Sequence, residues 1–158
     1  MRRNRIRRSH TAVIAFVLAV LLFGVALAAE PVTLLGYQIT FDGVTKVDHQ
    51  STWIYRAEWL GPDKYELSHW SLEVCTDYLL VSESNELNCT ATFGPDPTTG
   101  VYGIKWEDCS PQIGPEHPGP YTFSVTLSSM TDPRQGDVRV GVKAGQGEID
   151  VSNPLHER

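Results

Sequence analysis

Beyond its first 29 residues, the 158-residue sequence lacks helical periodicity, which argues against a helical fold. It also lacks the paired-cysteine and histidine spacing of zinc sites, the acidic loop motif of EF-hands and the G-x-S-x-G turn of serine hydrolases. Cysteine is scarce, with three residues, and thirteen basic residues are outnumbered by nineteen acidic ones. These absences remove the usual sequence signals of a metal centre, a nucleophilic enzyme and a basic nucleic-acid surface.

The N-terminal segment has the composition of a secretory signal peptide. Residues 1–8 contain five arginines and no acid, residues 11–29 carry no charge, and the triplet A-L-A at 26–28 matches a cleavage site. We therefore expect a signal peptide over 1–28, cleaved at its end, and a single domain over 29–158. The alternative is an uncleaved N-terminal anchor, because the uncharged run is long enough to span a bilayer. Either way, the rest of the chain is expected to be secreted or extracellular.

Removal of the signal peptide would make the chain strongly acidic. Five arginines and no acid would be lost, which leaves eight basic residues against nineteen acidic ones and a net charge near −11. Nucleic acid and anionic lipid both require a basic surface, so neither is an expected partner, and no membrane contact is expected after cleavage. An extracellular polysaccharide or a surface protein fits this composition better.

Short runs of alternating apolar and polar residues fill the remaining sequence. The clearest run is 121–129, where every second residue is apolar. The run 31–41 alternates except at Leu34-Leu35, which suggests a bulge, and Asp42-Gly43 is a turn signal. Comparable alternating runs lie at 51–60, 67–75, 89–93, 102–107, 138–144 and 149–151, and 78–81 is a short apolar run. About eight short strands, each with one apolar face, predict an all-β antiparallel β-sandwich, with a barrel as the alternative.

The stretch from Cys89 to Cys109 predicts a β-hairpin. The register that keeps its apolar residues on one face pairs Phe93 with Tyr102, Ala91 with Ile104 and Cys89 with Trp106. The connection would then be 94–101, where an Asp-Pro-Thr-Thr-Gly segment suits a type I-like turn. Polar loops are expected on either side of the hairpin, at 82–88 and 110–120.

Three cysteines in an exported chain imply one disulfide and one leftover thiol, or an intermolecular link. If the strands run up and down, Cys89 and Cys109 lie at the same end of the hairpin. Alternation along the strands instead places Cys75 and Cys109 away from the apolar face and Cys89 on it. Alternation fails first at strand ends, so the pairing of Cys89 with Cys109 is favoured.

His69, beside Trp70, is a candidate ligand contact. Alternation places Trp70 in the core and His69 on the outer face of its strand, where an ordinary surface histidine is expected. A Ser-His-Asp set can be drawn from Ser68 or Ser71, His69 and several aspartates, but no local signature of an activated nucleophile supports it. No catalytic residue is therefore assigned.

Aromatic and acidic residues offer two further possibilities. Trp53, Tyr55 and Trp59 resemble a carbohydrate-stacking platform, although aromatic residues at period two within a strand more often belong to the core. A carbohydrate platform predicts that two of these rings, or one of them and Trp70, are exposed side by side, whereas core residues would be buried. Acidic loops could supply oxygen ligands to calcium, but no cofactor or metal is assigned because no binding-loop motif is present. These loops contain Asp42, Asp48, Asp63, Asp96 and Asp132.

Three segments carry a family resemblance: L-S-H-W at 67–70, D-P-T-T-G-x-x-G-I-K-W-E at 96–107 and V-x-V-G-V-K-A-G at 138–145. Together they resemble a family of secreted bacterial β-rich proteins of uncharacterised function. The resemblance spans most of the mature chain and implies an exported all-β module. It implies no catalytic residue.

The first functional hypothesis is a secreted or cell-surface, non-catalytic β-sandwich that serves as an interaction or structural module. The second is a carbohydrate- or calcium-dependent adhesion domain, and the third is a secreted hydrolase. The hydrolase would require His69 or His49 to meet a carboxylate and a nucleophile in one pocket.

Overall fold

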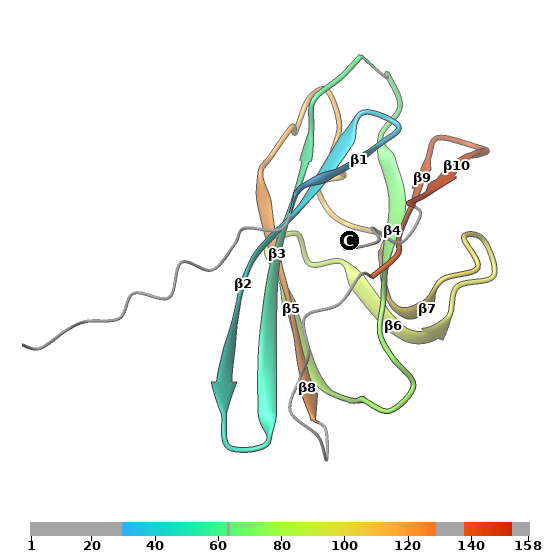
Figure 1. Cartoon of the computed structure of the whole chain (residues 1–158). Coiled ribbons are helices and arrows are strands. Elements are labelled where there is room, and N and C mark those ends of the chain that lie inside the picture. The colour runs from blue at the N-terminus through green and yellow to red at the C-terminus, as the bar shows by residue number, and fades with distance from the viewer. Residues whose placement is uncertain (1–29, 63, 129–137, 153–158) are drawn as a thin grey trace, which may run out of the picture.

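The computed structural model describes residues 30–62, 64–128 and 138–152. Its ten strands form two five-stranded antiparallel sheets that pack against each other, so the predicted β-sandwich is confirmed (Figure 1). Sheet 1 contains, in spatial order, β1 (Val32–Leu34), β2 (Tyr37–Val47), β3 (Gln50–Trp59), β8 (Tyr121–Ser128) and β5 (Leu79–Asn85). Sheet 2 contains β10 (Glu148–Val151), β9 (Val140–Ala144), β4 (Leu67–Glu73), β7 (Tyr102–Glu107) and β6 (Thr90–Pro95). These described residues include no helix that could cross a membrane.

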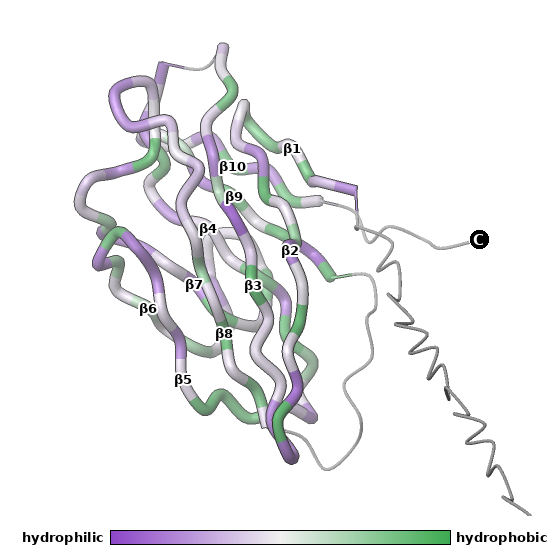
Figure 2. The backbone as a smooth tube through the Cα atoms, turned by 90° about the vertical axis from the view of Figure 1, so that its left-hand side faces the viewer, coloured by the Kyte–Doolittle hydropathy of each residue, from purple (hydrophilic) through white to green (hydrophobic). Residues whose placement is uncertain are grey.

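The two sheets meet in an aromatic core. Trp70 of β4 stacks on Trp106 of β7 with ring centroids 4.4 Å apart, and both indoles contact Phe123 of β8 edge-on. Phe123, Val125 and Leu127 point inward from β8 between polar neighbours, as the alternation predicts. The same alternation of hydrophobic and hydrophilic residues runs along the strands in Figure 2.

In the first strands, the bulge and the turn that the sequence predicts occur in the opposite places. Leu34 pairs directly with Tyr37, so Leu35-Gly36 is a two-residue hairpin turn rather than a bulge. Both residues have positive φ, 48° and 77°, as a type I′ turn requires. Conversely, the expected turn at Asp42-Gly43 is a bulge within β2, where the register shifts between Phe41 and Gly43. The expected single strand is thus a tight hairpin whose second strand continues to Val47.

The β6–β7 hairpin forms as predicted, but its register differs by two residues. Phe93 lies opposite Ile104, not Tyr102, and Pro95 takes the place opposite Tyr102. A slip of two residues keeps every side chain on its predicted face. The connection shortens to 96–101, because the Asp96 N–H donates to the Val101 carbonyl and closes the turn at 2.8 Å. The predicted polar loop at 82–88 is also shorter, since β5 extends to Asn85.

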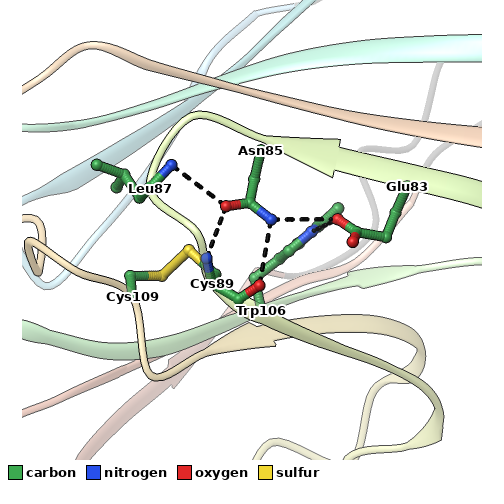
Figure 3. Close-up of a disulfide and its surroundings, with 6 residues drawn as sticks. All are labelled: Glu83, Asn85, Leu87, Cys89, Trp106 and Cys109. Atoms are coloured by element: carbon green, nitrogen blue, oxygen red, sulfur yellow. Dashed lines mark hydrogen bonds between the residues drawn. A yellow bond between two sulfur atoms is a disulfide. The ribbon is translucent and has the colours of Figure 1, made fainter.

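A disulfide joins Cys89 to Cys109, which confirms the favoured pairing, and Cys75 is free and exposed. The connection from β5 to β6 is ordered by the side-chain amide of Asn85 (Figure 3). Its Oδ1 accepts the N–H groups of Leu87 and Cys89, and its Nδ2 donates to Glu83 and to the Cys89 carbonyl. This crossing from sheet 1 to sheet 2 is therefore fixed by hydrogen bonds and by the covalent bond beside it.

Candidate functional site

An open cleft of about 800 Å³ lies at one end of the sandwich. Three segments that are far apart in the sequence build it: the β3–β4 connection with the start of β4, the loop between β7 and β8, and the β9–β10 turn, all in the upper part of Figure 1. We call this the end cleft. Its lining consists of Lys64, Tyr65, Glu66, Ser68, Gln112, Pro115, Glu116, Gly145 and Gln146.

Buried groups hold the walls of the end cleft in place. The hydroxyl of Tyr37, a fully buried residue of β2, donates to the Tyr65 carbonyl and lies 3.5 Å from the carbonyl of Ile113. Ile113 is itself 1% exposed, and its carbonyl accepts the Leu67 N–H at 2.8 Å. The sequence predicts a polar loop at 110–120, but this buried isoleucine anchors the loop to the sandwich. The third wall is attached by the Gly145 N–H, which donates to the Glu66 carbonyl at 3.1 Å.

The polar side chains of the end cleft are open to a ligand. Within the described part of the chain, five of them make no side-chain hydrogen bond or ion pair: Glu66, Ser68, Gln112, Glu116 and Gln146. A polar group without a protein partner is solvated in the free protein and can exchange water for a ligand group. A volume of this size is within the usual range of ligand pockets.

A second polar cluster lies on the outer face of sheet 2, beneath the β6–β7 turn. Ser71 of β4 donates to Oδ2 of Asp96 at 2.6 Å, and Thr99 donates to the same oxygen at 2.6 Å. The Thr98 N–H donates to the other oxygen at 3.0 Å. His69 Nε2 lies 3.2 Å from Oδ2 of Asp96 but has no hydrogen-bond partner among the described residues. We call this group the Asp96 cluster; it attaches the turn to β4.

The outer-face position predicted for His69 is correct, but its expected surface exposure is wrong. His69, Ser71 and Asp96 are at most 5% exposed because the turn folds over them. The turn also packs on β9, where a Cβ added to Gly141 would lie 2.6 Å from Cβ of Thr99. Only a residue without a side chain allows this approach.

Burial and hydrogen bonding set the protonation of the Asp96 cluster. Burial raises the pKa of the Asp96 carboxyl, but the hydrogen bonds from Ser71, Thr99 and Thr98 outweigh it and hold the pKa at about 2. Burial also lowers the pKa of His69, because it disfavours the charged imidazolium. The charge of Asp96 opposes that shift without reversing it. At neutral pH the cluster therefore contains a carboxylate and a neutral imidazole.

The Asp96 cluster contains the residue types of a catalytic triad in a different arrangement. In a triad, the serine donates to the histidine and the histidine to the carboxylate. Here the Ser71 hydroxyl donates to the carboxylate instead, and a carboxylate with a pKa of about 2 is a weak general base at neutral pH. The geometry suits a structural attachment of the turn.

The aromatic stripe belongs mainly to the core. Tyr55 is 7% exposed and Trp70 is fully buried, while Trp53 and Trp59 are half-buried. Phe41 packs on Trp53 and Tyr55 with ring centroids 5.6 and 5.4 Å away. The predicted ligand contacts Trp53, Tyr55, Trp59 and His69 thus do not converge on the end cleft.

The acidic loop residues are dispersed. Asp42 pairs with Arg56, Asp48 is exposed in the β2–β3 turn beside the exposed His49, and Asp96 is buried. Asp63 and Asp132 lie outside the described residues, as do residues 1–28, where the sequence predicts a signal peptide. Within the described ranges, no three His, Cys, Asp or Glu residues form a group that could hold a metal ion.

The chain matches no protein-family model, no curated protein and no solved structure. Sequence reasoning missed the end cleft because its polar residues come from three separate connections. The available signals were Gly145 in a turn and the four prolines of the 110–120 loop, which mark the segments that form its walls.

Proposed function

We propose that this protein is an exported, non-catalytic β-sandwich module that binds its partner in the end cleft. The observation that carries the proposal is the set of five polar side chains that line one open cleft without partners in the described chain. Concave sites with a few convergent polar groups are the usual form of binding sites on rigid scaffolds.

Two features support export. The basic, apolar and small-residue succession of residues 1–28 is the pattern of a secretory signal. The disulfide between Cys89 and Cys109 is a feature of proteins that fold in oxidising compartments, and its presence is compatible with an extracellular location.

The Asp96 cluster supports a non-catalytic function. It is the place where the described structure brings serine, histidine and aspartate together, and the β6–β7 turn covers it. A buried serine that donates to a weakly basic carboxylate is not activated as a nucleophile.

The test is retention of the purified protein on the cell envelope of the producing organism. The protein is obtained by expressing the whole sequence in a secreting host, and its depletion from solution is measured. We expect the wild type to be retained and Glu116→Arg to lose most of its retention, because a bulky cation replaces an exposed carboxylate in the end cleft.

The matched control is Asp77→Arg, which makes the same charge change at an exposed position in the β4–β5 connection, outside the cleft lining. It should be retained like the wild type. Equal retention of both variants, or no retention of the wild type, would overturn binding through the end cleft.

A further inference from the structure

The end cleft combines an exposed aromatic ring with a mixed set of hydrogen-bonding groups. Tyr65 is 40% exposed. The two glutamine amides and the Ser68 hydroxyl can both donate and accept hydrogen bonds, whereas the two glutamates accept when ionised. Sugar rings have the complementary chemistry, because their hydroxyl groups donate and accept and their C–H faces pack on aromatic rings.

The Tyr65 ring is held in position before a ligand arrives. A Cβ added to Gly145 would lie 2.9 Å from Cγ of Tyr65, so the β9–β10 turn contacts the ring because glycine stands there. The φ of Gly145 is +57°, which also favours glycine. The Lys64 ammonium lies 5.3 Å from the ring centroid. A preorganised ring lowers the entropic cost of binding.

The charges of the end cleft disfavour an anionic ligand. Two carboxylates and one ammonium line it, on a chain whose formal net charge is −6 before any processing. Nucleic acid, teichoic-type polymers and acidic polysaccharides would meet repulsion at this surface. Neutral sugars avoid this cost, and their hydroxyl groups can donate charge-assisted hydrogen bonds to Glu66 and Glu116.

We infer that the end cleft binds a neutral polysaccharide, with Tyr65 as the stacking surface and the surrounding amide, hydroxyl and carboxylate groups as hydrogen-bond partners for sugar hydroxyls. This inference rests on the proposed function and specifies the class of ligand. It places carbohydrate binding on loop residues and not on the Trp53, Tyr55 and Trp59 stripe, which packs mainly in the core.

The test is affinity electrophoresis in native gels that contain one soluble polymer each. The neutral probes are laminarin, xyloglucan, glucomannan and dextran, and alginate is the anionic comparison. We expect at least one neutral polymer to retard the wild type, alginate to leave its mobility unchanged, and EDTA to have no effect, because the binding groups are the protein's own side chains.

Two tyrosine variants make the test specific. Tyr65→Ala should weaken the affinity for the retarding polymer at least tenfold, and Gln146→Ala should weaken it in the same direction. Tyr102→Ala is the matched control, because Tyr102 is 37% exposed on β7 and lies outside the cleft lining. Thermal unfolding of each variant checks that the fold is intact.

The outcomes separate this inference from the proposed function. No retardation by any neutral polymer, or equal losses in Tyr65→Ala and Tyr102→Ala, would overturn the polysaccharide inference. If Glu116→Arg still abolishes retention on the envelope in that case, binding through the end cleft stands and its ligand is of another class. Loss of retardation in EDTA would contradict direct recognition by these side chains.

Discussion

At the scale of single residues, hydrogen bonds converge on the Asp96 carboxylate from different parts of sheet 2. Ser71 comes from the middle of β4, and Thr98 and Thr99 come from the turn that contains Asp96 itself. Together these donors supply the hydrogen bonds that a carboxylate needs when only 3% of its residue is exposed. Removing one partner of a buried hydrogen bond leaves the other partner unpaired, which costs folding free energy.

We expect Asp96→Ala to lower the free energy of unfolding by about 3 kcal/mol, because it leaves the buried Ser71 hydroxyl without an acceptor and releases the turn. Urea unfolding measures the change. Asp77→Ala is the control, since Asp77 is exposed, and it should change stability by less than about 0.5 kcal/mol. Similar losses in the two variants would show that Asp96 does not stabilise the turn.

The pH dependence of stability provides an independent measure of the same carboxylate. Its folded-state pKa of about 2 lies below the ordinary value of 3.8, so the unfolded chain binds the proton first as the pH falls. The stabilisation is therefore complete above about pH 5 and is lost as the pH falls from 4 towards 2. We expect Asp96→Asn to be less stable than the wild type by about 2 kcal/mol near neutral pH and this gap to shrink below pH 4. A gap that does not change with pH would contradict the assignment.

The position of His69 shows what residue patterns can and cannot predict. Alternation along β4 placed His69 on the opposite face from Trp70, and this is correct because side-chain direction follows from the local backbone. Its burial depends on a turn that begins 27 residues later and folds back over the strand. Contacts at that separation leave no periodic signal near His69.

At the scale of strands and turns, the same residue types serve in different local structures. Leu35-Gly36 forms a turn and Asp42-Gly43 forms a bulge, although each pair ends in glycine. Which one forms depends on whether the chain reverses there or continues beside its partner strand. The pairing with the neighbouring strand determines whether a turn or a bulge forms. Pairing also sets the register of β6 and β7, so the alternation predicted the faces of the hairpin residues but not their register.

Two glycines allow a direct test of how the β6–β7 turn packs on sheet 2. In Gly141→Ala the new Cβ would lie 2.6 Å from Cβ of Thr99, so the turn must shift and the Asp96 cluster must loosen. We expect a loss of about 2 kcal/mol in unfolding free energy. Gly147→Ala should be close to neutral, because no atom lies within 4 Å of a Cβ added there. Equal effects of the two substitutions would contradict close packing at Gly141.

At the scale of the whole molecule, the sequence predicted the layers of the sandwich better than its binding surface. Inward residues such as Trp70, Trp106 and Phe123 each belong to a strand in which every second residue is apolar. Strands of this kind form sheets with one apolar face, and two such faces must pack together to form a core. The end cleft depends on how three connections meet, and those connections contain glycine, proline and polar residues without periodicity. Its location could only come from the tertiary structure.

The disulfide holds together the end of the β6–β7 hairpin that is farthest from its turn. Cys89 precedes β6, Cys109 follows β7, and the two are 20 residues apart. Beside them, the Ser110 N–H donates to the Leu87 carbonyl at 2.9 Å, so the chain that enters and leaves the hairpin is held in one place.

Removing this bond in the double variant Cys89→Ala, Cys109→Ala should therefore lower the unfolding free energy by about 3 kcal/mol, because a loop of this length restricts the unfolded chain. Cys75→Ser should leave stability unchanged, since Cys75 is exposed and unbonded. Alkylation of the unfolded, unreduced protein followed by peptide mapping should label Cys75 alone, and reduction should make all three cysteines reactive. Label on Cys109 without reduction, or a loss of stability in Cys75→Ser equal to that of the double variant, would show that a different pair of cysteines is bonded.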